Sequence, residues 1–384
     1  PKKKKIIYSM PVSIFNFGVK KMSWRGKMFA YLTIFFNFLL FFSYLAFLSD
    51  PTKNSGIALL GLAYPIIFLI NLILFLVWFF KRNIFFFPTL IILILGMYHH
   101  SRFLQINPKK HESISNNEKI KVMSFNVRLF DLYNWTNNEE IKSKIIQLIK
   151  KQEPDIVCFQ EYYYDNKKEF ITREIILKEL GMEYYHESFT DESNKNSLFG
   201  LATFSKFPII NTGDLEFKND HSNHCMWSDI VCESDTLRIY NTHLGSIRFN
   251  NSDYKIIGGK GSPLWPNQKI PKQDIYNRLK IGFAKRAQQI IELIPALENS
   301  PYKRILCSDL NDTPISYAYN QFSNLFTDSF TKSGFGIGGT YIGKLPFLRI
   351  DYIWHDKNLD SFNFKTHQSE LSDHKAISVE IMLR

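Results

Sequence analysis

The most hydrophobic part of this chain lies in its first quarter. Residues 28–48 and residues 56–80 contain no charged side chain. A membrane-spanning helix needs about 20 predominantly apolar residues, so both runs are long enough. A third apolar run begins at residue 84 and is followed by His99 and His100. We predict a bundle of three transmembrane helices, with a re-entrant or interfacial segment as the alternative for the third, at about residues 28–48, 56–80 and 84–100.

The rest of the chain alternates short apolar runs with polar turns. Helical spacing predicts helices over residues 136–152, opened by a capping box from Thr136 to Glu139, and over residues 273–294. Strand-like runs outnumber these helices, which excludes regular βαβ alternation and predicts a mixed α/β layered domain over residues 119–384, joined by a linker at 101–118. The expected strands are residues 119–127, 155–160, 201–205, 236–244, 304–307, 349–354 and 375–382.

Charge is divided as unevenly as hydrophobicity. Residues 1–100 hold 11 of the 47 Lys and Arg but only one of the 36 Asp and Glu, and the remainder is close to neutral. Most of the basic excess therefore flanks the first apolar run, in residues 1–27, and is poor evidence for nucleic-acid binding. Because positive flanks stay in the cytoplasm, we place the N-terminus there. Three spans put the layered domain outside the cytoplasm, which we predict to be the periplasm at a bacterial inner membrane; two spans would keep it inside.

The four cysteines, at 158, 225, 232 and 307, form no CxxC pair. We therefore predict neither a disulfide framework nor a zinc site.

Polar residues gather where the predicted strands end. The segment CSDLNDTPIS, residues 307–316, places two acids and an asparagine after an apolar run, which alone is typical of a turn. The same pattern recurs in five other segments, which carry Asn126, Glu161, His243, Asp351, and Asp373 with His374. Each residue has a structural explanation when taken singly, such as a turn or a satisfied core histidine. Their recurrence at six strand ends favours one shared site.

In order and context these six segments resemble the endonuclease/exonuclease/phosphatase superfamily, which has the deoxyribonuclease I-like fold. The matching segments are MSFNVR, IVCFQE, RIYNTHL, RILCSDLND, FLRIDYIW and LSDHKA, with Ser308 where the family motif has glycine. The resemblance covers residues 119–384. It implies a four-layer αββα sandwich and a metal-dependent hydrolase of phosphoesters.

The residue types suit that chemistry. A hard divalent cation neutralises phosphoryl oxygens, and Mg²⁺ binds carboxylates and other oxygen ligands. We assign Mg²⁺, or Mn²⁺ in its place, to Glu161 and Asn126, with Asp373 as a further ligand.

The remaining site residues are assigned to proton transfer and substrate binding. Asp309, held by Asn311, is the expected general base for the attacking water. His374 is expected to pair with Asp351, which raises the pKa of the imidazole. His243 is expected to hydrogen-bond the phosphate, with Asn311 beside it. Which histidine protonates the leaving oxygen stays open.

Residues 245–272 have no clear period and carry Gly and Pro throughout. A loop of this length is either functional or a plain surface insertion. As a substrate cover it would offer Trp265 as a further substrate contact.

Three functions compete at this point. The first is a nuclease. The second is a sphingomyelinase-like phosphodiesterase acting on lipids or small molecules, which the membrane anchor favours. The third is a membrane-tethered binding protein without catalysis. The expected partners are a phosphodiester substrate and the bilayer, and no obligate protein partner is evident.

Overall fold

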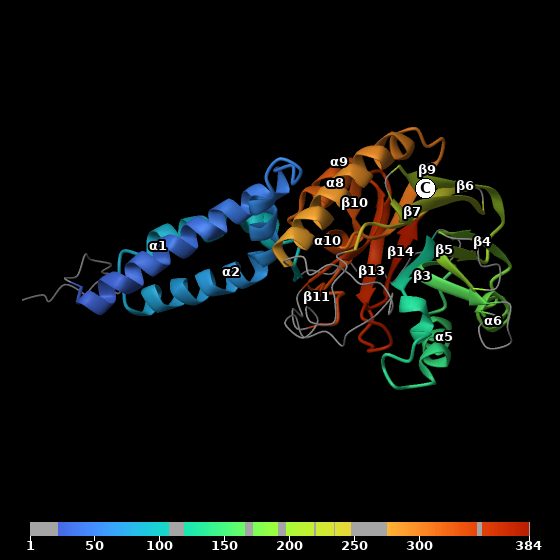
Figure 1. The fold of residues 1–384 in the computed structure, drawn as a ribbon, viewed down its shortest axis with the longest axis horizontal. Coiled ribbons are helices and arrows are strands. Elements are labelled where there is room, and N and C mark those ends of the chain that lie inside the picture. Colours follow the sequence, from blue (N-terminus) through green and yellow to red (C-terminus); the bar gives the residue numbers. More distant parts are fainter. Residues whose placement is uncertain are drawn as a thin grey trace, which may run out of the picture.

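The computed structural model describes residues 22–106, 119–165, 172–190, 197–218, 220–233, 235–246, 275–343 and 348–383. Its N-terminal part is a bundle of helices that extends from one side of a layered sandwich (Figure 1). Side-chain caps start the two long helices: Ser23 accepts from Gly26 N, and Asn54 accepts from Ile57 N. The bundle consists of α1 (Trp24–Tyr44), η1 (Leu45–Phe47), α2 (Ser55–Phe80), α3 (Phe86–Leu95) and α4 (Met97–His100).

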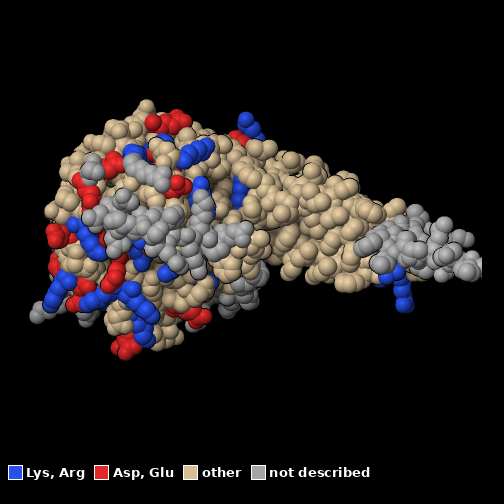
Figure 2. Space-filling model, turned by 180° about the vertical axis from the view of Figure 1, so that it is seen from behind, with Lys and Arg blue, Asp and Glu red and all other residues tan. Residues whose placement is uncertain are grey.

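Polar side chains lie inside the bundle among apolar ones, and its outside is mainly apolar. Trp78 Nε1 donates to the Thr33 hydroxyl at 2.9 Å, and Asn71 Nδ2 donates to Phe36 O at 3.0 Å. Only 28% of the most apolar window of each long helix is buried, whereas the core helix of a soluble protein is mostly buried. Figure 2 shows the resulting uncharged surface along the bundle. The exposed apolar residues include Tyr31, Phe35, Phe38, Ile66, Leu69, Ile73 and Ile91.

The prediction that residues 84–100 form one continuous spanning helix is wrong, because two short helices occupy this segment. Two helical stretches, Trp24–Phe47 and Ser55–Phe80, are long and apolar enough to cross a membrane. The third run is divided because α3 ends after 10 residues at Gly96, which lies too close to the Tyr44 ring to carry a side chain. The short helices α3 and α4 nevertheless run back along the bundle: Phe86 packs on Phe75, and Tyr44 Oη donates to Ile92 O at 3.0 Å.

Two six-stranded sheets form the layered domain. In each sheet one central pair is parallel, β2 with β3 and β8 with β9, and the other pairs are antiparallel. The first sheet has the order β13 (Asp360–Thr366), β14 (Ile377–Met382), β2 (Lys119–Asn126), β3 (Ile156–Asp165), β5 (Ser197–Ser205) and β4 (Tyr184–Phe189). The second has the order β10 (Phe326–Asp328), β12 (Asp351–Asp356), β9 (Lys303–Asp309), β8 (Asp235–His243), β7 (Asp220–Cys232) and β6 (Ile209–Phe217).

The sheets pack face to face and are covered by helices on both outer faces, so the predicted αββα sandwich is confirmed. Ile120, Val122 and Ile377 of the first sheet share one apolar cluster with Ile239 and Ile305 of the second. The helices α5 (Ile141–Gln152) and α6 (Thr172–Leu180) pack on the first sheet, and α8 (Ile275–Glu298) and α9 (Tyr317–Leu325) on the second (Figure 1). The four cysteines are buried and unpaired.

The expected capping box at Thr136 is absent from the described helix. The helix α5 begins at Ile141, and the Thr136 hydroxyl instead donates to the carboxylate of Asp131.

Arg102 fixes the helical bundle to the sandwich. Its guanidinium, which is buried, stacks on the rings of Phe47 and Tyr98 at 3.9 and 4.0 Å and donates to Pro314 O at 3.1 Å. Its own carbonyl accepts from Arg349 at 2.9 Å. Residues 101–106, the described part of the expected linker, therefore lie against the sandwich, and β1 (Leu104–Gln105) pairs with β11 (Gly336–Ile337).

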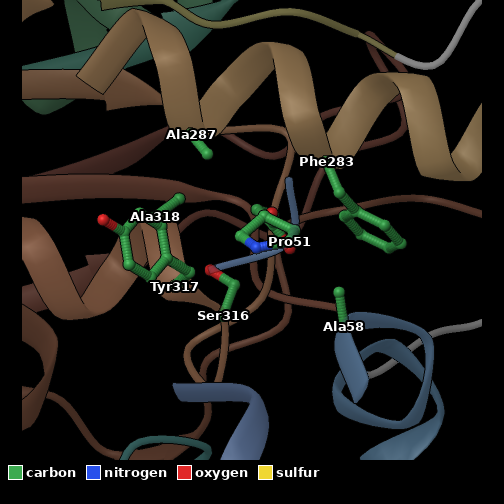
Figure 3. Close-up of a pocket in the computed structure, with 8 residues that line it drawn as sticks. Pro51, Ala58, Phe283, Ala287, Ser316, Tyr317 and Ala318 are labelled. Atoms are coloured by element: carbon green, nitrogen blue, oxygen red, sulfur yellow. The ribbon is translucent and has the colours of Figure 1, made fainter. Parts of the chain in front are cut away.

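A small pocket lies at this junction (Figure 3). The candidate site residues are not among those that line it. Its lining comes from the start of α2 and the turn before it, from α8, and from the start of α9 and the loop before it: Pro51, Ala58, Phe283, Ala287, Asp312, Ser316, Tyr317 and Ala318.

Candidate active site

The strand pairing brings the predicted site residues to one end of the sandwich. In the second sheet Asp309 is the register partner of both His243 and Asp351, one from each neighbouring strand. In the first sheet Asn126 is paired with Gln160, so the next residue, Glu161, emerges beside it. Because β2 and β3 are parallel, as are β8 and β9, each pair ends at a common edge, which explains why residues distant in the sequence meet here.

Asn126 and Asp309 form the centre of the site. Asn126 Nδ2 donates to Asp309 Oδ2 at 2.9 Å and to Glu161 Oε1 at 3.2 Å. Asp309 is fully buried and also accepts the backbone N–H of Asn311 at 2.9 Å. The side chain of Asn311 points elsewhere and donates to Leu244 O at 3.0 Å, which ties the Asp309 loop to the residue after His243. Asn311 therefore holds Asp309 through its backbone.

His374 and Asp351 form the predicted pair. His374 Nδ1 lies 3.0 Å from both oxygens of Asp351, and its Nε2 lies 3.8 Å from Asp309 Oδ2. Burial lowers the pKa of His374, but the carboxylates of Asp351 and Asp309 outweigh this effect and hold it well above its usual range. The two carboxylates therefore favour the protonated imidazole, whose Nε2 faces Asp309.

Glu161 and His243 line the other side of Asp309. Glu161 lies in a bulge of β3 with a φ of 48°, which turns its carboxylate toward the site. Burial raises the pKa of Glu161, the nearby charge of Asp373 raises it further, and His243 lowers it. His243 Nε2 lies 3.5 Å from Asp309 and 3.9 Å from Glu161, and it has no hydrogen-bond partner among the described residues.

Asp373 lies at the rim of this group. Its side chain is 30% exposed, and its Oδ2 is 3.6 Å from Arg128 Nε. Arg128 stacks on Trp135 at 4.4 Å, and its backbone N–H donates to Asn126 Oδ1 at 3.0 Å. Asp373 influences the pKa of Glu161, but no hydrogen bond joins the two among the contacts of the described residues.

Two separate sets of donors suit a hard divalent cation. The sequence assigns the metal to Asn126, Glu161 and Asp373. The side-chain amide of Asn126 already donates a hydrogen bond to Glu161. A second, tighter set consists of Asp309, Asp351 and His374, each with a ligand atom within 4.8 Å of the others. The desolvated carboxylate of Glu161 and the unpartnered nitrogen of His243 are consistent with a cation and an anion binding side by side.

The sequence of residues 123–374 matches the family model described as the Endonuclease/Exonuclease/phosphatase family. The chain belongs to this family. The predicted resemblance is thereby confirmed, and members of the family are hydrolases that act on phosphoesters. A separate model, described as a domain of unknown function, matches residues 26–103, which cover most of the helical bundle. Comparison with curated proteins finds no match.

Solved structures similar to this chain include a member of the Endonuclease/Exonuclease/phosphatase family. A family member from Bacteroides vulgatus is 15% identical with a TM-score of 0.52, and the match covers 69% of this chain and 99% of that one. The catalytic domain of human Nocturnin is 19% identical with a TM-score of 0.49, and coverage is 73% and 100%. A mannosyl-6-phosphatase from Bacteroides thetaiotaomicron is 15% identical with a TM-score of 0.49, and coverage is 69% and 100%.

The sequence analysis missed a buried polar layer behind the candidate site. Gln160 Nε2 donates to Asn241 Oδ1 at 2.7 Å, and Asn241 Nδ2 donates to Phe159 O at 3.0 Å, which links the two sheets directly under Asn126. The signal was present, because Gln160 and Asn241 are polar residues inside apolar strands. Ser308, which stands where the family motif has glycine, accepts from Trp354 Nε1 at 3.1 Å.

Thr340 and Tyr341 were also missed. The Thr340 hydroxyl accepts the backbone N–H of Asp351 at 3.1 Å, and Tyr341 forms a β-bridge with His374. No sequence motif marks this segment, and only the fold brings it to the site. The expected substrate contact Trp265 and all but the first residues of the 245–272 loop lie outside the described residues.

Proposed function

We propose that this protein is a membrane-anchored, divalent-metal-dependent hydrolase of phosphoesters. The observation that carries the proposal is the position of Asp309, whose Oδ2 accepts from Asn126 and lies within 4 Å of both His243 and His374. A buried carboxylate between a hydrogen-bond donor and two imidazoles suits proton transfer from a water molecule.

A bound Mg²⁺ or Mn²⁺ would supply charge neutralisation at the phosphoryl oxygens and a lowered pKa for the attacking water. The residues proposed to hold it are Glu161 and Asp373, with Asn126 beside them. This assignment is supported by the raised pKa of Glu161, since a buried carboxylate that is costly to ionise is stabilised by a cation.

Asp309 is the proposed base. Two N–H donors, from Asn126 and from the backbone of Asn311, fix its orientation. In the reaction the oxygen of water bonds to phosphorus, Asp309 takes one proton of that water, and the bond from phosphorus to the leaving oxygen breaks. The leaving oxygen takes a proton in turn.

The two histidines are proposed to bind the phosphoryl group. His374, held as a cation by Asp351, offers Nε2 to a phosphoryl oxygen. His243 Nε2, without a partner among the described residues, is free to donate to a second oxygen. Variants of each histidine would be compared on a substrate whose leaving group needs no proton. The histidine that protonates the leaving oxygen is the one whose loss matters least on that substrate.

Membrane anchoring is supported by the polarity of the helical bundle. Polar residues such as Asn71 and Thr33 face inward and make interhelical hydrogen bonds, whereas Phe, Ile and Leu face outward. From Phe29, which packs on Trp78, to Phe47, which packs on Tyr319, α1 and η1 rise about 27 Å, close to the hydrocarbon thickness of a bilayer.

The course of the chain supports the proposed orientation. The helix α1 runs toward the sandwich, α2 runs away from it, and α3 with α4 returns, so the start of α1 and the sandwich lie at opposite ends of the bundle (Figure 1). Basic residues near the start of α1 favour the cytoplasm for that end. The catalytic domain would then lie outside the cytoplasm, in the periplasm if the membrane is a bacterial inner membrane.

The orientation can be tested by labelling intact cells with a membrane-impermeant maleimide. The native cysteines are buried, so a cysteine in the variant K357C or K27C, both at exposed positions, would be the reactive one. Labelling of K357C but not of K27C is expected, and the reverse would overturn the orientation.

Activity can be tested with the full chain in detergent. Soluble chromogenic phosphodiesters and phosphomonoesters would be offered with Mg²⁺, Mn²⁺ or chelator, alongside DNA and RNA. Metal-dependent hydrolysis is expected, with a loss of about 100-fold or more in D309N and H374N. The matched controls D214N and H221N, at exposed positions, should keep full activity. Equal activity in D309N, or none in the wild type with any metal, would refute the proposal and favour a binding protein.

A further inference from the structure

An apolar patch lies on the sandwich where the helical bundle joins it. It consists of Leu104 and Ile106, in and after β1, and of Phe335 and Ile337, in and before β11. These side chains are 51%, 72%, 70% and 52% exposed, in that order. Leu104 and Ile337 are direct register partners, so the patch is built by strand pairing rather than by scattered residues.

The patch continues the apolar exterior of the bundle. Met97 and Tyr98 of α4 are each 62% exposed, and Arg102, buried against Phe47 and Tyr98, fixes the position of the chain just before Leu104. A contiguous apolar surface beside membrane-spanning helices is most simply covered by the same bilayer.

One short segment connects the patch to the catalytic residues. Gly338 N donates to Phe103 O at 3.3 Å, which holds the segment against the membrane side of the junction. Three residues later, Tyr341 forms the β-bridge with His374, and Ile342 N donates to Asp373 O at 2.7 Å. Residues 336–342 thus reach from an exposed apolar strand to the rim of the site.

The Asp309 loop makes a second connection. Pro314 O accepts from Arg102, and Ile315 packs at Gly61 of α2, where an added Cβ would lie 3.6 Å from its Cγ2. Asp309 and Ile315 are six residues apart in sequence, so at most about 20 Å separates the base from the helix. The catalytic ends of the strands are therefore on the side of the sandwich that faces the bundle.

We propose that the patch of Leu104, Ile106, Phe335 and Ile337 seats in the surface of the bilayer, and that the site hydrolyses phosphoesters carried by lipids of that membrane. This inference rests on the proposed function and names its substrate class. Water supplies the only co-reactant: its oxygen bonds to phosphorus, the bond to the leaving oxygen breaks, and the leaving oxygen takes a proton. The near-neutral charge of residues 101–384 argues against a nucleic-acid surface.

The test uses the full chain reconstituted in vesicles of phosphatidylethanolamine, phosphatidylglycerol and phosphatidic acid, with Mg²⁺ or Mn²⁺. Phosphorus NMR would follow hydrolysis of these lipids. Water-soluble short-chain analogues with the same headgroups separate the headgroup chemistry from its presentation in a bilayer. A soluble chromogenic phosphodiester and phosphomonoester report whether the site is active at all.

The variant F335S/I337S removes half of the patch without touching a catalytic residue. We expect a fall of about tenfold in vesicle-lipid hydrolysis and unchanged rates on the chromogenic substrates, because a bilayer-held site gains from high local substrate concentration. The matched control I210S alters a residue that is 56% exposed on β6, on the side away from the bundle (Figure 1), and should behave as wild type.

The remaining outcomes separate the two proposals. Hydrolysis of chromogenic substrates, DNA or RNA without hydrolysis of vesicle lipids would overturn the lipid inference and leave the proposed function standing. Equal rates on lipids and their soluble analogues, or an unaffected F335S/I337S, would also overturn it. Hydrolysis of nothing would refute the proposed function and this inference with it.

Discussion

Asn126 Nδ2 lies 2.9 Å from Asp309 Oδ2, and this hydrogen bond joins the two sheets of the sandwich at the centre of the site. The same amide group also reaches Glu161, so one asparagine positions two carboxylates from different strands. Both carboxylates are desolvated, and an unshared negative charge in such a place is costly. The site therefore depends on Asn126 to orient the two carboxylates and to stabilise their negative charge by hydrogen bonding.

Replacement of Asn126 tests this dependence. In N126A the carboxylate of Asp309 loses a donor and its orientation, so we expect kcat to fall about 100-fold and the free energy of unfolding to fall by about 1–3 kcal/mol. Steady-state kinetics on a chromogenic substrate and denaturant unfolding would measure these. N299A, at an exposed position after α8, should change neither quantity. Full activity in N126A would show that Asp309 is oriented by other contacts.

Asp351 and His374 should act as one unit. Asp351 lies 3.0 Å from His374 Nδ1 and raises the pKa of the imidazole, so D351N should remove the function of both residues. We expect D351N and H374N each to lower kcat by about 100-fold or more and the double variant to be little worse than either one. A double-mutant cycle measures this directly. Losses that multiply in the double variant would mean that the two residues act independently.

The strand-end chemistry could be predicted from sequence because it interrupts apolar runs. Asn126, Glu161 and His243 each follow several β-branched or aromatic residues, and a polar residue at such a point has few structural uses. Pairing of the strands could not be predicted in the same way. The long strand β7 and the edge strand β6 carry polar residues at many positions, so neither shows clean alternation, and no strand was expected over their central residues.

The predicted helix boundaries differ from those of the structure because other contacts compete for the same groups. Thr136 has the sequence of an N-cap, but its hydroxyl is already used by Asp131 and the helix starts at Ile141. The second helix was expected to end at residue 294, yet α8 continues to Glu298, and Tyr240 Oη donates to Ala296 O in its last turn at 2.9 Å. In the bundle, composition could not reveal that Gly96 would divide the third apolar run against Tyr44. In the first case a local contact decided the outcome, and in the other two a tertiary contact did.

Glu161 should determine metal affinity. Its side chain is 18% exposed and desolvation raises its pKa, so a cation stabilises the charged carboxylate, and E161Q removes that charge with little change in shape. We expect about tenfold or more weaker binding of Mn²⁺ by calorimetry and a matching rise in the metal concentration needed for activity. E216Q, at an exposed position on β6, serves as the control. Unchanged Mn²⁺ binding in E161Q would indicate that Asp309, Asp351 and His374 hold the metal instead.

Arg102 should couple the helical bundle to the catalytic domain. It is 3% exposed, stacks on two aromatic rings, and bonds to the backbone of the Asp309 loop through Pro314 O. In R102A these contacts are lost and a cavity remains, so we expect the free energy of unfolding of the full chain in detergent to fall by about 2–4 kcal/mol. R102K keeps the charge but lacks the planar guanidinium, and an intermediate loss is expected.

The control for this prediction is K53A, at an exposed position before α2, which should leave stability unchanged. Activity adds a second readout. If Arg102 holds the Asp309 loop at the membrane side of the sandwich, R102A should slow hydrolysis of vesicle lipids more than hydrolysis of a soluble chromogenic substrate. Equal slowing of both would mean that Arg102 supports the fold without orienting the site toward the bilayer, because a loss of folded protein lowers the two rates in the same proportion.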